Sequence, residues 1–281
     1  QSLYIGKNAY QLLYFGQYKD SLNLGIIGNC KSAALINEDS SIDWCCLPQF
    51  DSPSVFGKIL DEKIGGNFKV ECDDSFRITQ SYIADTCILC TRFSNGSDAF
   101  ELLDFMPRFK KEDGIFYAPP EIVRVFKHLS GTPTFRVIYD PKLEYSIGDT
   151  NNYVKDNFIV SIVDDKHYDT LFLSTDFDNN KIISGAEIQL TEDHFTTVSY
   201  NEKIKVPSLK QTQFAFERTK VYWLNWCHKT PTFSNYNQDK DKFLEYMFID
   251  LGRIRCVLGK EPPFMTTREE LKVDKARDEW R

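Results

Sequence analysis

Five side chains in the segment 43–52 have the right types and spacing to bind a sugar. Asp43, Trp44, Gln49, Asp51 and Ser52 combine an aromatic ring with carboxylate, amide and hydroxyl groups. The ring can stack on the apolar face of a pyranose, and the polar groups can hydrogen-bond to its hydroxyls. One interpretation of the segment is therefore a rim that contacts a carbohydrate.

A packing role explains the same segment, and it is the interpretation we favour. Trp44, Phe50, Pro53 and Phe56 would fill a corner of a β-structure, and Asp51 would cap the turn that follows it. Alanine at Asp51 separates the two roles, because unchanged sugar binding by a folded variant would rule out the rim.

The cysteines indicate buried thiols rather than metal chemistry. The chain has 8 cysteines, and Cys87 and Cys90 form a C-x-x-C pair. A zinc site needs a second pair of ligands at suitable spacing, and the sequence offers none. Positions three apart on a strand also face opposite sides of the sheet. We predict reduced structural thiols, and we expect neither a metal nor a cofactor.

Composition excludes several classes of protein. The formal net charge of -7 argues against a nucleic-acid-binding face, which needs clustered Lys and Arg. The chain lacks an apolar run of the roughly 20 residues that span a bilayer. The first residues show neither the basic region nor the apolar stretch of a signal peptide. We therefore expect a cytoplasmic protein that contacts neither nucleic acid nor membrane.

Short apolar runs separated by turn residues predict strands along most of the chain. Residues 33–36 and 42–47 flank five polar turn formers and read as a hairpin, and Asn95-Gly96 marks a tight turn. Further candidate strands are 66–72, 76–83, 88–93, 99–105, 121–129, 134–139, 158–163, 170–174, 187–190, 195–200 and 212–216. Gly25-Ile-Ile-Gly28 shows neither a clear strand nor a dinucleotide fingerprint. The fold class is mainly β, an antiparallel two-sheet sandwich of the supersandwich type.

The pattern becomes helical near Glu217. Residues 217–226 predict one helix, and residues 239–258 predict a second, with Phe243, Met247 and Ile254 near helical spacing. The predicted organisation is a lead-in over 1–22, a β-sandwich over 23–216, a helical linker over 217–238 and a helical tail over 239–281.

The segment Gly25–Gly66 resembles the start of the amino-terminal domain of bacterial and archaeal glucoamylase/trehalase-like proteins of glycoside hydrolase family 15. Other family-like pieces follow in the family's order at Gln80–Phe93, Glu101–Pro107, Ile122–Gly131 and Tyr139–Tyr145. The resemblance covers about residues 24–227 and disappears after about Asn237.

This resemblance implies a non-catalytic domain. Family members are inverting α-glucosidases whose two catalytic glutamates lie in a helical barrel beyond this β-sandwich, so no residue here inherits a catalytic role. The implied partners are an α-glucoside or oligosaccharide and a helical-barrel catalytic domain or partner chain. The alternative is a free-standing carbohydrate- or protein-binding module without hydrolase activity. A domain that docks tightly on a partner should expose a large apolar patch when alone.

Overall fold

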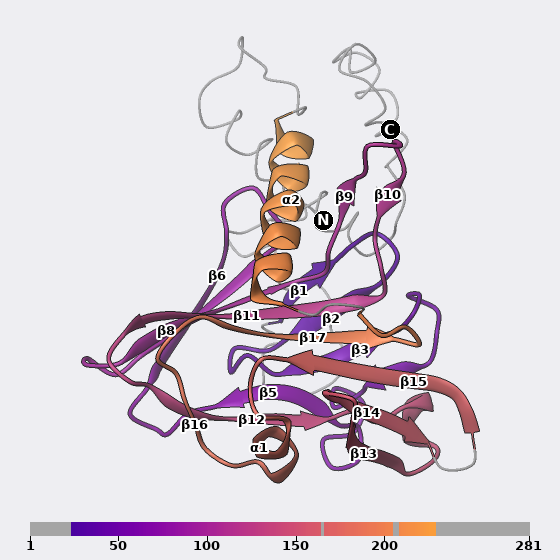
Figure 1. Cartoon of the computed structure of the whole chain (residues 1–281), viewed down its shortest axis with the longest axis horizontal. Helices are drawn as coiled ribbons and strands as arrows, with labels where there is room; N and C mark the ends of the chain where they lie inside the picture. The colour runs from indigo at the N-terminus through magenta and orange to yellow at the C-terminus, as the bar shows by residue number, and fades with distance from the viewer. Residues whose placement is uncertain (1–23, 164–165, 205–207, 229–281) are drawn as a thin grey trace, which may run out of the picture.

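The strands form two antiparallel sheets that lie face to face (Figure 1). The computed structural model describes residues 24–163, 166–204 and 208–228. The expected mainly β, two-sheet sandwich is confirmed. The predicted lead-in and the predicted tail over 239–281 lie outside the described residues.

The smaller sheet has seven strands in the order β1-β2-β3-β5-β12-β16, with β4 paired to β3. Its strands are β1 (Gly25–Gly28), β2 (Ala33–Ile36), β3 (Ile42–Cys46), β4 (Ser54–Phe56), β5 (Asn67–Glu71), β12 (Thr134–Asp140) and β16 (Ile188–Gln189). The predicted hairpin over residues 33–47 is present as β2 and β3.

The larger sheet has eight strands in the order β13-β14-β15-β17-β11-β8-β7-β6. Its strands are β6 (Arg77–Tyr82), β7 (Leu89–Ser94), β8 (Ala99–Phe105), β11 (Glu121–Ser130), β13 (Thr150–Lys155), β14 (Phe158–Val163), β15 (Lys166–Thr175) and β17 (His194–Tyr200). The predicted Asn95-Gly96 turn joins β7 to β8, and Gly96 takes a φ of 97° that favours glycine.

Aromatic rings from both sheets fill the space between them. Phe93 and Phe100 of the larger sheet stack with centroids 4.6 Å apart, and Phe100 stacks at 5.0 Å on Phe135 of the smaller sheet. Phe126 stacks on the same Phe135 at 5.4 Å. All four rings are buried. These phenylalanine rings therefore form a continuous core between the two sheets, which accounts for part of the high phenylalanine content of the sequence.

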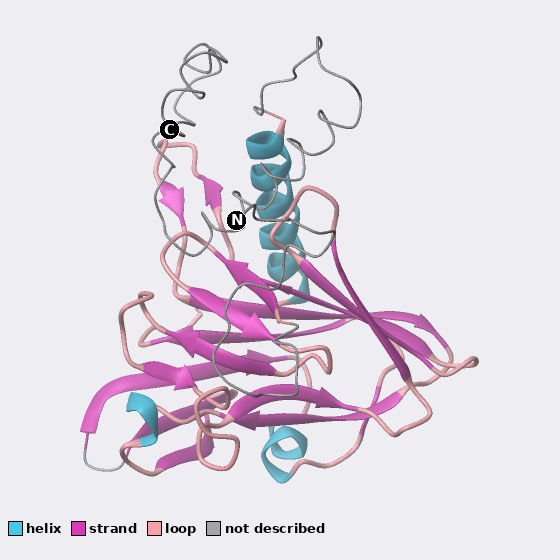
Figure 2. Ribbon diagram, turned by 180° about the vertical axis from the view of Figure 1, so that it is seen from behind, coloured by secondary structure: helices cyan, strands magenta, loops and turns pink. Residues whose placement is uncertain are grey.

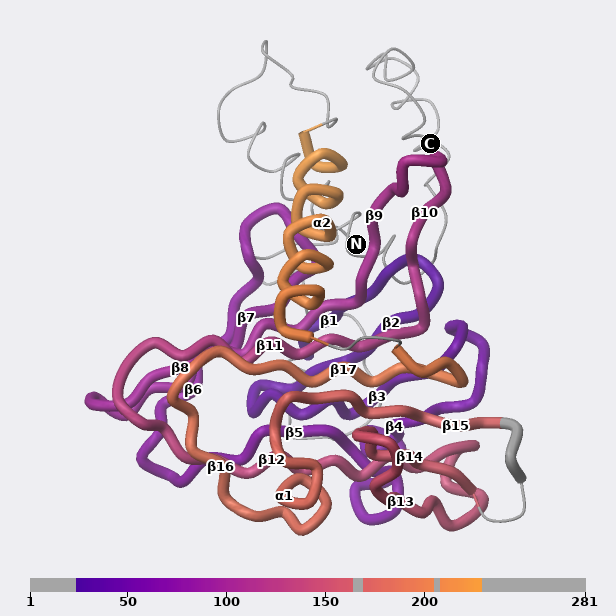
Figure 3. Tube along the Cα trace, viewed as in Figure 1, coloured from indigo at the N-terminus to yellow at the C-terminus, as the bar shows by residue number. Residues whose placement is uncertain are grey.

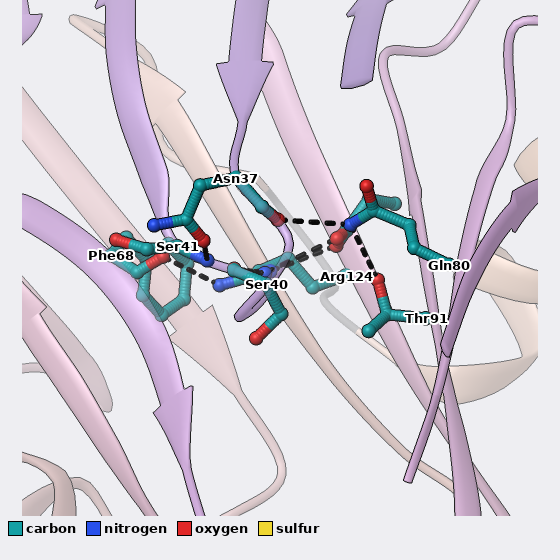
Figure 4. A network of polar contacts seen from close by, with 8 residues as sticks. Asn37, Ser40, Ser41, Phe68, Gln80, Thr91 and Arg124 are labelled. Carbon is teal, nitrogen blue, oxygen red and sulfur yellow. Dashed lines mark hydrogen bonds and ion pairs between the residues drawn. The ribbon is translucent and has the colours of Figure 1, made fainter. Parts of the chain in front are cut away.

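A buried arginine also joins the two sheets (Figure 4). Arg124 of β11 donates to both carboxylate oxygens of Asp104 at 2.8 and 3.2 Å, and to the carbonyl of Phe68 in β5 at 2.7 Å. It also donates to the carbonyl of Ser40 in the β2–β3 turn. Burial raises the pKa of Asp104, while the charge and hydrogen bonds of Arg124 act in the opposite direction. The pair thus fixes the β2–β3 turn against the larger sheet.

Helix α2 (Leu209–Cys227) packs on the outer face of the larger sheet. Ala215 and Phe216 of α2 lie against Leu103, Phe105 and Val123 of the sheet. Figure 2 shows the helix extending beyond the sheets, and Figure 3 shows it rising beside a two-stranded hairpin. The hairpin consists of β9 (Phe109–Lys110) and β10 (Phe116–Tyr117). Within the described residues, the other helical segments are α1 (Asn179–Ser184) and the 3-10 turn η1 (Glu144–Ser146).

The structure differs from the sequence-based element assignment at two places. Residues 212–216 are helical rather than a last strand, because Ser208 caps α2 by accepting the Gln211 N–H and so starts the helix eight residues before Glu217. The predicted boundary at 216/217 therefore falls inside a helix. Residues 25–28, for which no strand was evident, form β1, which is held by pairing with β2.

Candidate functional site

The five predicted rim residues lie on β3 and in the loop that joins β3 to β4. The loop contains a tight turn in which the Gln49 carbonyl accepts the Ser52 N–H at 3.1 Å, and the Ser52 hydroxyl accepts the Gln49 N–H at 3.1 Å. Ser52 therefore provides the cap that we had assigned to Asp51. Gln49 and Asp51 are exposed at the surface.

Asp43 does not belong to this surface. It is buried, and its carboxylate accepts hydrogen bonds from the Asn37 amide at 3.0 Å and from the Ser41 hydroxyl at 2.5 Å. The β2–β3 pairing shifts register here, since Leu35 pairs with Trp44 and Ile36 with Ile42, so Asp43 lies between the two pairs and is buried beside Ile42, while Trp44 is half-buried. Asp43 therefore stabilises the turn over residues 37–41 and is not positioned to bind a ligand together with Trp44.

Tyr145 completes the aromatic part of the site. Its ring lies 6.5 Å from the Trp44 ring, centroid to centroid, and its hydroxyl donates to the Ser52 carbonyl at 3.4 Å. Reasoning from the segment 43–56 missed Tyr145, because it lies about a hundred residues further along the chain. The only signal was its place in the family-like stretch that ends at Tyr145.

Tyr145 sits in a left-handed turn that is unfavourable for side-chain-bearing residues. Glu144, Tyr145 and Ser146 have φ values of 51°, 57° and 61°. Each such residue costs about 1–2 kcal/mol relative to right-handed backbone. The Ser146 hydroxyl holds the turn by donating to the Ile64 carbonyl at 2.8 Å. Strain of this kind concentrates at functional sites, so it marks the turn as a candidate.

Large apolar side chains surround this turn and face solvent. We call them, with Trp44, the rim surface: Phe50, Ile59, Leu60, Ile64, Tyr145 and Ile147. Leu60 is 69% and Ile147 is 79% exposed. Three loops bring these residues together, since the Ile59 N–H donates to the Asp43 carbonyl and Ser146 contacts Ile64. The packing role is thus only partly right, because Phe56 is buried but Phe50 is exposed.

A second notable group lies where β11 begins. Burial, together with the nearby Glu202, raises the pKa of Glu121 to about 7. Burial and the same two glutamates raise the pKa of Tyr117 to about 12. A carboxyl that keeps its proton near neutral pH has the property of a general acid. The sequence carried no signal for the raised pKa of Glu121. The groups that raise it come from β11 and from the end of β17, which are far apart in the chain.

The cysteines behave as structural groups. Burial raises the pKa of Cys46 and of Cys90 to about 11 and of Cys72 to about 12, so these thiols keep their protons at neutral pH. Cys87 is disulfide-bonded, which contradicts the prediction of a reduced thiol at that position. Among the described residues, no cluster of three or more His, Cys, Asp or Glu could hold a metal ion.

In the part of the chain that the structure describes, no helix is both long and apolar enough to cross a lipid bilayer.

The chain is similar to a trehalase-like family model and to proteins named trehalase. A family model described as "Trehalase-like, N-terminal" matches residues 14–162. Trehalase 2 of Sulfolobus acidocaldarius is 28% identical over 197 residues, which are 69% of this chain and 31% of that protein. The trehalase of Thermoplasma acidophilum is 27% identical over 202 residues, which are 69% of this chain and 34% of that protein.

A shorter and closer match is to Trehalase 1 of Sulfolobus acidocaldarius, 42% identical over 85 residues, which are 30% of this chain and 15% of that protein. The chain thus spans about a third or less of the length of these relatives. Among solved structures, a putative kojibiose phosphorylase from the human microbiome aligns with 81% of this chain and with 36% of its own chain. The TM-score is 0.41 and the sequence identity is 9%, so no argument is drawn from this likeness.

Proposed function

The chain belongs to the trehalase-like, N-terminal family, and from this premise we propose that it is the non-catalytic amino-terminal domain of an α-glucoside hydrolase. The extent of the match carries the proposal. The family model covers more than half of this chain, whereas the chain spans only 31% of Trehalase 2. The chemistry would then reside in the other two thirds of such a protein, as in the helical barrel of glycoside hydrolase family 15.

The rim surface is the part of this domain that we assign to contact with the catalytic domain. A surface of clustered, exposed apolar side chains is costly on a domain in water and typically marks an interface. Its central turn is strained, and the hydroxyls of Ser146 and Tyr145 tie it to the Ile64 and Ser52 carbonyls of two neighbouring loops. Such a turn holds the Tyr145 ring in a fixed orientation beside Trp44. A contact that shapes a substrate entrance needs a fixed orientation of this kind.

The boundary of the domain follows from α2. We place the end of the sandwich after β17 and treat α2, whose cap is Ser208, as the start of the connection to the rest of the protein. This moves the predicted linker start from residue 217 to residue 209.

The alternative function is a free-standing carbohydrate-binding module. The observation in its favour is the pair Trp44 and Tyr145, whose rings lie 6.5 Å apart next to the exposed Gln49 and Asp51. Titration of the purified chain with maltose and longer α-glucans tests it by calorimetry. Saturable binding that is lost in Trp44→Ala would support the module.

The first test of the main proposal is catalytic. The purified 281-residue chain, at high concentration, is incubated with trehalose, maltose and longer α-glucans, and released glucose is measured. We expect no release. Turnover that disappears on replacing an acidic residue of this chain would overturn the assignment.

The second test is a binding experiment with a matched control. The chain is mixed with the remaining two thirds of a trehalase relative, and complex formation is followed by analytical ultracentrifugation. Ile147→Asp should weaken the complex at least about tenfold, because a charge is buried in an apolar contact. Ile183→Asp, an exposed isoleucine of α1, is the control and should leave it unchanged. Equal effects of the two substitutions would remove the rim surface from the interface.

A further inference from the structure

We infer that Arg108 and Tyr222 form a binding site for a carboxylate, in the junction between α2 and the β9–β10 hairpin. Neither residue belongs to the rim surface, and the inference does not depend on the proposed function.

Arg108 is buried and firmly held at this junction. It directly precedes β9, and 8% of its surface is exposed. Its backbone N–H donates to the Thr219 hydroxyl of α2 at 3.1 Å, and its Nη1 donates to the Asn29 carbonyl in the β1–β2 turn at 2.8 Å. Figure 3 shows α2 rising beside the hairpin that Arg108 introduces. Contacts with the helix and with the turn therefore fix the position of the guanidinium group.

The positive charge of Arg108 has no counter-charge in the part of the chain that the structure describes. None of the ion pairs between described residues includes Arg108. Arg124, which is also buried, pairs with both carboxylate oxygens of Asp104. A charge inside a protein is costly unless it is paired, and a bridging water would leave the charge uncompensated. The junction therefore favours an anion.

The charged residues around Arg108 increase the positive charge of the junction. The Arg218 guanidinium of α2 donates to the Lys110 carbonyl at 2.7 Å, so a second arginine lies along the same hairpin strand. Lys110 itself is exposed. The acidic residues of the hairpin, Glu112 and Asp113, are exposed in its turn. An approaching anion therefore meets mainly cations beside β9.

The guanidinium donors that lack a partner mark where the anion binds. Nη1 makes the hydrogen bond to Asn29, whereas the buried Nε has no partner. The Nε–H and one Nη2–H of an arginine point the same way and form the fork that receives both oxygens of a carboxylate. The rings of Phe116 and Tyr222 meet at 82° and lie 4.6 and 5.1 Å from the guanidinium carbon, so they form a corner around it.

Tyr222 adds a further donor to the same junction. Its hydroxyl is buried without a hydrogen-bond partner, and so is the indole N–H of Trp223, whose ring lies 4.9 Å from the Tyr222 ring. Buried donors without a partner are rare in folded proteins, and each calls for an acceptor. Because these groups all donate, the missing ligand is rich in acceptors.

A carboxylate matches these donors in charge and in shape. Its single negative charge neutralises Arg108, whereas a phosphate group carries about −1.5 to −2 at pH 7 and would leave an excess charge in the junction. Its two oxygens fit the two donors of the fork, which the single centre of a chloride ion cannot do. We therefore assign the site to a carboxylate.

Titration of the full chain with sodium acetate tests the site. The Arg108 Nε–H resonance is followed by proton–nitrogen NMR at constant ionic strength, and its loss in Arg108→Lys assigns it. We expect a saturable shift with acetate and none with sodium chloride alone. Tyr222→Phe should weaken acetate binding about tenfold, because it removes one hydrogen bond to an anion.

Two controls separate this effect from a change in the fold. Tyr222→Phe should keep the thermal unfolding midpoint of the parent in chloride buffer, because the hydroxyl that it removes has no partner there. Tyr153→Phe, at an exposed tyrosine of β13, is the matched control and should leave acetate binding unchanged.

Adding the rest of a trehalase relative identifies the source of the carboxylate. If an acidic side chain of that protein fills the site, its addition shifts the Arg108 resonance and acetate competes with it. If acetate shifts the resonance and the relative does not, the site takes free carboxylates. The inference would be overturned if neither shifted the resonance, if inorganic phosphate alone did so, or if Tyr222→Phe and Tyr153→Phe had equal effects.

Discussion

Replacing Glu121 with glutamine should stabilise the protein at alkaline pH and leave its stability unchanged at acidic pH. Glu121 begins β11, where burial and the neighbouring Glu202 raise the pKa of its carboxyl from 4.5 to about 7. The unfolded chain releases this proton near pH 4.5, whereas the folded chain holds it to about pH 7. The contribution of the protonated Glu121 carboxyl to the free energy of unfolding is therefore complete below pH 4.5, and it is lost as the pH rises through 7.

The size of the effect follows from the same shift in pKa. A carboxyl pKa that moves from 4.5 to about 7 corresponds to roughly 3 kcal/mol of unfolding free energy. Glutamine keeps the shape of the side chain and never ionises. We therefore expect Glu121→Gln to match the parent at pH 4.5 and to exceed its stability by up to about 3 kcal/mol at pH 8.

Urea denaturation followed by tryptophan fluorescence measures this difference. The parent chain and Glu121→Gln are compared at both pH values, so that the titration of all other groups cancels. Glu112→Gln, an exposed carboxyl in the turn of the β9–β10 hairpin, is the control and should show no pH-dependent difference. Parallel pH profiles of Glu121→Gln and the parent would refute the reasoning, because Glu121 would then have the same pKa in both states.

Substitutions at three further places test the packing of the fold by thermal and urea unfolding. Arg124→Met should cost about 3–5 kcal/mol, since it leaves Asp104 buried without a counter-charge, and adding Asp104→Leu should recover part of the loss. Ser208→Ala removes the cap of α2 and should cost about 1 kcal/mol, with the loss seen first in helical circular dichroism. Gly65→Ala places a Cβ 2.3 Å from the Gly57 carbonyl oxygen and should cost about 1–3 kcal/mol. A loss below 0.5 kcal/mol in any of these, on the scale of ordinary surface changes, would contradict the contact it tests.

Local sequence signals predicted most of the sandwich. The β2–β3 hairpin and the β7–β8 turn were predictable because alternating apolar residues and turn formers act within a few residues of each other. The start of α2 was missed because residues 212–216 are as compatible with a strand as with a helix. The Ser208 cap and the sheet face beneath the helix decide between them.

The candidate site was less predictable than the fold. Trp44, Gln49, Asp51 and Ser52 do reach one surface region, since one strand and one short loop carry them. Asp43 is buried because the β2–β3 pairing shifts register at this residue, and the regular alternation expected from the sequence does not predict such an irregularity.

The sequence by itself determined the family, the β class and the loop that carries Gln49, Asp51 and Ser52, because these depend on residue types in a fixed local order. Only the tertiary structure placed Tyr145 beside Trp44, buried Asp104 against Arg124 and raised the pKa of Glu121. Each of these depends on distances between strands that are far apart in the chain. Such distances are set by the packing of two sheets around a shared aromatic core, which no local pattern encodes.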